Sequence, residues 1–194
     1  MTPLKHKKAA IELSIGTIVI IVLAMAMLIL GLVLIRGIFS GATDSVKNIN
    51  AGVQTEINKL FQSENDKAVI RLTDSTAQIK QGEDFGVAFG IRNINKGATE
   101  ATVFNYQVAL DDSNIKNNCG VSEQQANSWV KIGTGRMSVQ PGEVGYDVVL
   151  ISVPVDAPLC KTKFRLTIWE QGKSPSDAYV NPPFFVQINS KGIF

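Results

Sequence analysis

The pattern of hydrophobic positions divides the chain into two helical stretches followed by a region of alternating residues. Leu13 to Ile35 supplies 23 residues without a charge, enough for a helix to cross about 30 Å of hydrocarbon. Beyond this stretch the apolar positions recur at helical spacing, which indicates an amphipathic helix over 40–64. These positions are Val46, Ile49, Val53, Ile57 and Leu60. We therefore predict one long helix over 10–66 that is uniformly apolar over 13–35.

From Ala68 the periodicity becomes alternating, which is typical of β-strands. The main predicted strands are 68–73, 85–93, 102–110, 144–153, 162–170 and 183–189, with shorter candidates at 77–80, 129–132 and 136–139. Glycine-containing turns separate them, such as "KQGED" at 80–84 and "QPGE" at 140–143. Short strands with this punctuation predict an antiparallel β-sandwich over 67–194.

The charges on either side of the apolar stretch predict its orientation. Lys5, Lys7 and Lys8 precede it, whereas Arg36 is the first charge after it. This bias favours a cytoplasmic N-terminus and an extracellular β-domain, as in a single-pass membrane precursor. A removable secretory signal has an apolar core of only about 7–15 residues, so that interpretation is disfavoured.

The N-terminal sequence resembles a known family. The segment "KKAAIELSIGTIVIIVLAMAMLILGLVLI" (7–35) is similar to the N-terminus of archaeal type IV pilin-like proteins, and "SIGTIVIIVLAMAM" is similar to the start of archaellins. The resemblance implies that a membrane peptidase removes a basic leader over 1–9, with the cut beside Lys8, Ala9 or Ala10. The helix then leaves the bilayer and packs against copies of itself in a filament.

The resemblance also implies a role for Glu12, which stands at the edge of the apolar stretch. After processing it would pair with the new terminal amine of a neighbouring copy. The sequence departs from the family pattern here, because glycine commonly precedes the cut and the glutamate is usually fifth in the mature chain. A simpler interpretation is that Glu12 marks the membrane interface at the start of a plain anchor helix.

The outer domain carries a second resemblance. The segments "IKQGEDFGVAFGIRNINKG" (79–97) and "VQPGEVGYDVVLISV" (139–153) are similar to immunoglobulin-like modules of prokaryotic surface proteins. The predicted fold class is therefore α+β: a long N-terminal transmembrane or filament-core helix followed by an all-β, immunoglobulin-like antiparallel sandwich. This resemblance implies a fold and leaves the ligand open.

The two cysteines, Cys119 and Cys160, both lie beyond the apolar stretch. In an oxidising exterior we expect them to form a disulfide. A bridge would close a loop of about 40 residues and pin the polar segment 111–128 to the sandwich. Two buried free thiols are the alternative, and the spacing of the cysteines does not distinguish between them.

Candidate chemistry is sparse. The single histidine, His6, precedes the apolar stretch, so histidine-based catalysis or metal binding in the outer domain is not expected. Asp111, Asp112 and Asn114 offer oxygens to calcium, but their spacing does not match an EF-hand loop. No nucleophile with its base and no cofactor motif is recognised. We predict a non-enzyme without metal or cofactor.

The function expected from these features is that of a structural subunit of an archaeal pilus or archaellum-like filament. Its partners would be other copies of itself, the membrane and the leader peptidase, with the β-domain exposed for adhesion to a surface or glycan. A net charge of +2 gives no electrostatic reason to expect nucleic acid. The alternative is a membrane-anchored surface protein that does not polymerise and binds a partner through its immunoglobulin-like domain.

Overall fold

The computed structural model describes residues 16–31, 51–63, 65–95, 97 and 99–191. The chain divides into two compact units, Met1–Ser45 and Val46–Phe194. In the first unit, residues 16–31 are helical. The second unit contains α2 (Ala51–Leu60), β1 (Ala68–Ile70), β2 (Thr76–Lys80), β3 (Asp84–Arg92), β4 (Thr102–Leu110), α3 (Ile115–Cys119), α4 (Glu123–Asn127), β5 (Val130–Ile132), β6 (Thr134–Val139), β7 (Val144–Ser152), β8 (Lys161–Glu170) and β9 (Pro183–Asn189).

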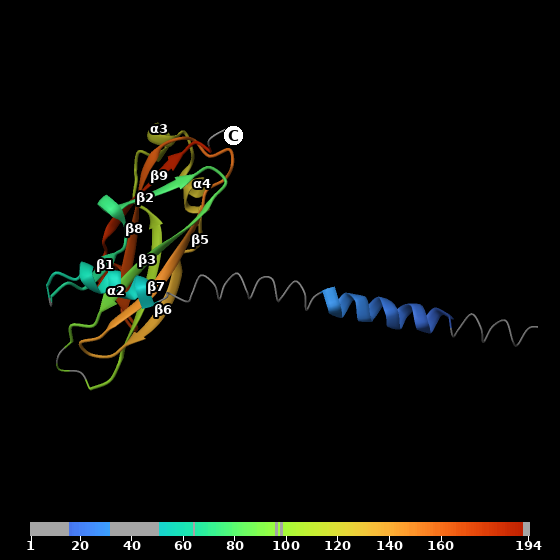
Figure 1. The fold of residues 1–194 in the computed structure, drawn as a ribbon, viewed down its shortest axis with the longest axis horizontal. Helices are drawn as coiled ribbons and strands as arrows, with labels where there is room; N and C mark the ends of the chain where they lie inside the picture. Colours follow the sequence, from blue (N-terminus) through green and yellow to red (C-terminus); the bar gives the residue numbers. More distant parts are fainter. Residues whose placement is uncertain (1–15, 32–50, 64, 96, 98, 192–194) are drawn as a thin grey trace, which may run out of the picture. The chain divides into compact units, whose positions relative to one another are not determined.

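The second unit is a β-sandwich of two sheets (Figure 1). One has four strands in the order β1-β3-β7-β5, and the other has five in the order β2-β9-β8-β4-β6. These orders correspond to the ABED and A′GFCC′ sheets of immunoglobulin-like sandwiches. One difference is that β5, which occupies the D position, precedes β6 in the chain. The fold of the outer domain is therefore immunoglobulin-like in its strand arrangement.

The core lies between the sheets because alternate residues of each strand face inward. Phe89 and Ile91 of β3 are fully buried, as are Phe104 of β4 and Phe164 of β8. The neighbouring strands β4 and β8 contribute to the same core through matching registers, with Tyr106 opposite Ile168. The alternating residues of these strands therefore form the two inner faces of the sandwich.

The amphipathic helix α2 packs on the outer face of the four-stranded sheet. Ile57 is fully buried, and it lies over Gly90 of β3, where an added Cβ would come within 2.6 Å of its Cγ2 atom. The Tyr146 hydroxyl donates a hydrogen bond to the Asn58 side chain at 2.6 Å. A glycine in the strand therefore provides the space in which the helix sits.

The prediction of one long helix is wrong. The structure has a helix at residues 16–31 and a separate ten-residue helix, α2, which belongs to the compact unit of the sandwich. After α2 the chain turns, and it enters β1 at Ala68. The physical reason is that α2 packs on the protein's own sheet through Ile57 of its apolar stripe. Predicted helical positions at 10–15 and 32–50 lie outside the described residues.

The outer domain is also neither all-β nor wholly antiparallel. The chain crosses from the first sheet to the second at Thr73–Ser75, and β2 then pairs with β9 in parallel. The predicted strand over 68–73 is therefore shorter, because the chain leaves that sheet after β1. Two short helices, α3 and α4, occupy the segment expected to be a polar loop. Ser122 and Gln125 form a capping box at the start of α4.

Candidate functional site

The predicted processing site lies outside the described residues. Lys8, Ala9 and Ala10 fall there, as does Glu12. Cleavage beside them, and pairing of Glu12 with a neighbouring copy, remain predictions.

The helix at residues 16–31 presents its aliphatic side chains to solvent. Their exposed fractions run from 49% at Ile21 to 74% at Met27. The helix carries no charged residue. Contiguous apolar surface of this kind marks a site of contact with protein or lipid. None of the helices within residues 16–31, 51–63, 65–95, 97 and 99–191 combines the length and hydropathy needed to cross a membrane.

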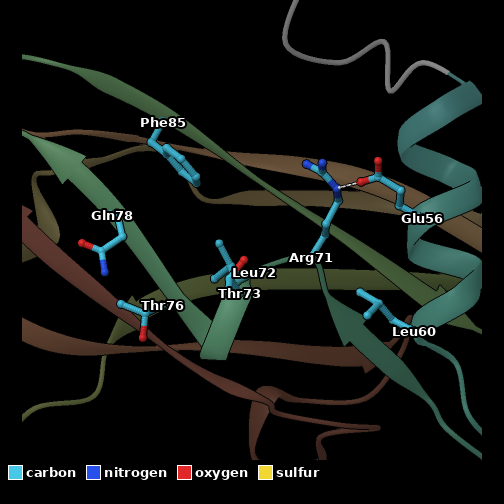
Figure 2. Close-up of a pocket in the computed structure, with 8 residues that line it drawn as sticks. All are labelled: Glu56, Leu60, Arg71, Leu72, Thr73, Thr76, Gln78 and Phe85. Carbon is cyan, nitrogen blue, oxygen red and sulfur yellow. Dashed lines mark hydrogen bonds and ion pairs between the residues drawn. The ribbon is translucent and has the colours of Figure 1, made fainter.

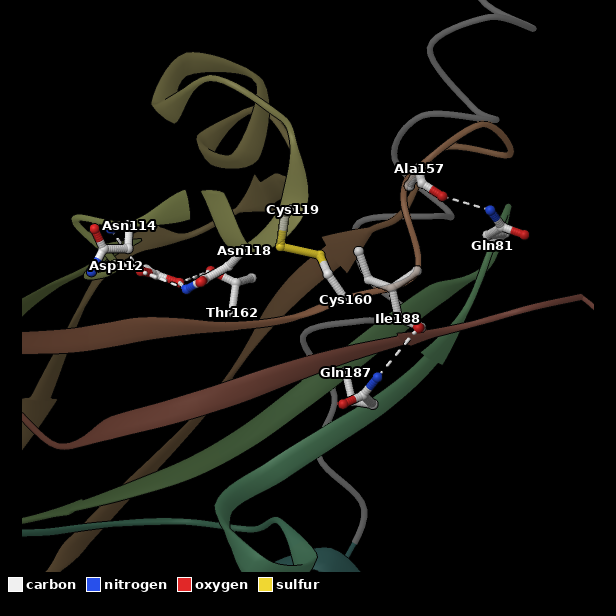
Figure 3. Close-up of a disulfide and its surroundings, with 10 residues drawn as sticks. All are labelled: Gln81, Asp112, Asn114, Asn118, Cys119, Ala157, Cys160, Thr162, Gln187 and Ile188. Carbon is white, nitrogen blue, oxygen red and sulfur yellow. Dashed lines mark hydrogen bonds between the residues drawn. A yellow bond between two sulfur atoms is a disulfide. The ribbon is translucent and has the colours of Figure 1, made fainter. Parts of the chain in front are cut away.

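The two cysteines are joined, which confirms the predicted disulfide. Cys119 ends α3 and Cys160 precedes β8, and their Cα atoms are 5.4 Å apart (Figure 3). Both residues are buried. The disulfide therefore links the helical segment between β4 and β5 to the start of β8.

Polar contacts around the disulfide hold the same segment. The Asp112 carboxylate accepts hydrogen bonds from the Asn118 amide and the Thr162 hydroxyl, as Figure 3 shows. The neighbouring Asp111 carboxylate accepts from Arg165 Nε at 3.0 Å and lies 3.1 Å from Lys163 Nζ. Hydrogen bonds from Arg165, followed by one from Lys163, hold the pKa of Asp111 below its usual value. The two carboxylates thus serve as anchors, one of them facing two cations.

The β7–β8 loop, residues 153–160, carries two exposed apolar side chains close to the disulfide. Val155 is 72% exposed and Leu159 is 58% exposed. The loop is held at three points: Gly82 N donates to Val153 O at 2.9 Å, Gln81 Nε2 donates to Ala157 O at 2.5 Å, and Cys160 is in the disulfide. We call it the apolar loop.

A groove of about 550 Å³ opens between α2 and the edge strand β2. Its lining residues are Glu56, Leu60, Arg71, Leu72, Thr73, Thr76, Gln78 and Phe85, and we call it the edge groove (Figure 2). Leu60, Leu72 and Phe85 give it an apolar surface. Arg71 Nε donates a hydrogen bond to the Glu56 carboxylate at one side. The groove exists because β1 ends early and leaves the first part of β3 without a neighbour on that side.

Inside the sandwich a hydrogen bond between strand side chains joins the two sheets. The Tyr106 hydroxyl of β4 donates to the Asp147 carboxylate of β7 at 2.6 Å. Burial and, second, this hydrogen bond raise the pKa of Tyr106 well above its usual value. Within the part of the chain that the structure describes, no three His, Cys, Asp or Glu side chains are grouped as metal ligands would be.

The sequence analysis missed both apolar surface features of the sandwich. The edge groove depends on where β1 ends and on how α2 packs, which no local pattern indicates. The apolar loop had a signal in "VPVDAPLC" (153–160), where Val155 and Leu159 each directly follow a proline. The capping box of α4 was also predictable from the sequence, because Ser122 precedes Gln125 by three residues.

Comparisons with known proteins identify no family. No protein-family model matches the chain, and no curated protein matches it. Among solved structures, the chain is similar to the PapD-like domain 7 of human CEP192, at 11% identity and a TM-score of 0.40, over 69% of this chain and 91% of that one. It is also similar to the Pseudomonas aeruginosa CupB2 chaperone, at 11% identity and a TM-score of 0.34, over 63% of this chain and 55% of that one. Such low scores establish neither a relationship nor a function.

Proposed function

We propose that the protein is a structural subunit of a surface filament of the archaeal pilus or archaellum kind. Copies associate through the apolar helix at residues 16–31, and the sandwich faces outward for adhesion or surface contact. The observation that carries the proposal is the exposure of the aliphatic side chains of this helix, between 49% and 74% for the large ones. Such a surface is stable in water only when another apolar surface covers it.

Two further observations support the proposal. The disulfide between Cys119 and Cys160 is typical of proteins in an oxidising exterior. The apolar stretch resembles the start of archaellins, and in that family copies of this helix pack together. Helices without charged residues associate by close packing, which small residues favour. Ala24 and Ala26 supply such positions near the middle of the helix.

The direct test is to place a charge in the helix of the full-length protein. Leu23, which is 58% exposed, is changed to Arg, and assembly is followed by electron microscopy and light scattering. We expect Leu23→Arg to abolish assembly, because an unpaired cation buried between helices is strongly unfavourable. Leu23→Met is the matched control and should assemble as the parent does.

Two results would argue against filament assembly through this helix. Filaments formed equally well by Leu23→Arg would contradict assembly through this helix. Native protein that remains monomeric in detergent, and forms no filaments, would favour the alternative of a membrane-anchored surface protein that does not polymerise.

Processing is tested separately on protein from the native cells. We expect intact-mass measurement to show a chain that has lost the basic leader, with its new terminus beside Lys8, Ala9 or Ala10. A mature chain that still begins near Met1 would contradict processing by a leader peptidase.

A further inference from the structure

We propose that the apolar loop of one copy docks into the edge groove of a second copy. The inference rests on the proposed function for the presence of neighbouring copies, and it adds a specific contact between their sandwiches. It is drawn from two apolar features of the same domain that the domain itself leaves uncovered.

The apolar loop is built as a projecting contact. Val155 and Leu159 are 72% and 58% exposed, the largest values among the exposed large hydrophobic residues of the described sandwich. Ala157 between them is buried and fixed by Gln81, and the disulfide holds the end of the loop (Figure 3). A loop that is already ordered loses little conformational entropy when it binds.

The edge groove is suited to receive such a loop. Its apolar lining comes from three elements: Leu60 at the end of α2, Leu72 after β1, and Phe85 of β3. Leu60 is itself 41% exposed. The groove has a volume of about 550 Å³, which is larger than one aliphatic side chain.

The loop carries a charge of opposite sign to one of the two charged residues that border the groove. Asp156 lies between the two apolar residues of the loop and is exposed. Arg71 borders the groove, and its Nε group donates to Glu56. In the described part of the chain its other two nitrogens have no hydrogen-bond partner, and Figure 2 shows them turned away from Glu56. A carboxylate entering the groove would meet these donors.

The position of the two features makes the contact intermolecular. The apolar loop is fastened to Gln81 and Gly82, just beyond the C-terminal end of β2. The groove lies against Thr76 and Gln78, on the N-terminal half of the same strand. A contact between two different patches of identical subunits is heterologous, and it produces an open-ended assembly when its rotation does not close into a ring.

The test is disulfide cross-linking between two full-length variants mixed under assembling conditions. One carries Val155→Cys and the other carries Leu60→Cys. The native cysteines are bonded and buried, so they should not react. We expect a cross-linked heterodimer from this mixture. We expect at most a background yield when Leu60→Cys is replaced by Lys131→Cys, an exposed position on β5, at the opposite edge of the four-stranded sheet from β1.

Charge reversal gives a second measurement that does not depend on cysteine geometry. Adding Asp156→Lys to the Val155→Cys chain should lower the cross-linking yield up to about fivefold, the range expected for a surface ion pair. Adding Arg71→Glu to the partner chain should restore it. If neither Asp156→Lys nor Arg71→Glu alters the cross-linking yield, Asp156 and Arg71 do not face each other and the docking geometry is overturned.

The outcomes separate this inference from the proposed function. Assembly without the specific cross-link overturns the docking contact and leaves helix-mediated assembly standing. A cross-link that persists in a Leu23→Arg background supports the docking contact, even where filaments are lost. If the full-length protein neither assembles nor forms the cross-link, both the docking contact and the helix-mediated assembly are contradicted.

Discussion

At the scale of single residues, the hydrogen bond between Tyr106 and Asp147 joins the two sheets of the sandwich. Tyr106 is 3% exposed, and its hydroxyl lies 2.6 Å from the Asp147 carboxylate. Its raised pKa means that the folded state disfavours the ionised phenol. The stability that follows is present below the unfolded pKa of about 10 and is lost as the pH rises above it.

We expect Tyr106→Phe to lower the free energy of unfolding by about 1–2 kcal/mol at neutral pH, because it removes a buried donor and leaves a carboxylate oxygen unpaired. The difference from the parent should shrink above about pH 10. Urea unfolding at several pH values measures both effects. Tyr146→Phe is the control, since its hydroxyl bonds to Asn58 in an exposed setting, and it should cost less. Equal losses for the two variants would contradict the importance of the buried contact.

At the same scale, sequence reasoning succeeded where one local pattern sufficed. The Cys119–Cys160 bond was predicted from two cysteines in a domain expected to face an oxidising exterior, and the structure contains it. The partner of Tyr106 could not be found this way, because Asp147 lies in the other sheet. Asp111 was considered as a calcium ligand, whereas the fold places it against Arg165 and Lys163. These partners depend on strand register, which no single segment encodes.

At the scale of elements, the packing of α2 against β3 depends on Gly90. An added Cβ there would lie 2.6 Å from Ile57 and 3.1 Å from Phe61, so the helix would have to move. We expect Gly90→Ala to destabilise the protein by about 1–3 kcal/mol and to speed amide hydrogen exchange in α2. Gly97→Ala is the control, because an added Cβ there meets nothing within 4 Å. Unchanged exchange in α2 would show that the helix does not rely on this glycine.

The disulfide governs a second element, the segment containing α3 and α4. We expect the double variant Cys119→Ser, Cys160→Ser to lose roughly 3–4 kcal/mol, the chain-entropy value for a loop of this length. Hydrogen exchange should rise first in α3 and α4, which contact the sandwich less extensively than its strands do, and later in β3 and β8. A uniform rise across the whole sandwich would indicate that the bridge supports the core and not only this segment.

Element positions were more predictable than their packing. The long strands β3, β4, β7, β8 and β9 match their predicted ranges to within one or two residues, because each is a run rich in β-forming residues that is bounded by turn residues. The parallel pairing of β2 with β9 was missed, since alternation is the same in parallel and antiparallel sheets. The helical stripe over 53–60 was recognised, but its period does not reveal which surface it packs against.

At the scale of the whole molecule, the sandwich should be independent of the N-terminal unit. The buried core cluster draws only on residues between Ala77 and Ile188. We expect a chain beginning at Val46 to fold with its disulfide intact and to form no filaments where the full-length protein does. Light scattering and intact-mass analysis under non-reducing conditions test this. Filaments formed by the shortened chain at the same concentration would shift the main self-contact from the helix to the sandwich.

The parallel pairing of β2 with β9 has a mechanical consequence. Five residue pairs join these strands, from Thr76 opposite Phe185 to Lys80 opposite Asn189. Tension applied between the start of β2 and the end of β9 runs along both strands, so their backbone hydrogen bonds resist sliding together and do not open one at a time. Force carried through β2 and β9 would therefore have to be higher to separate them than it would be for two strands whose hydrogen bonds open in turn.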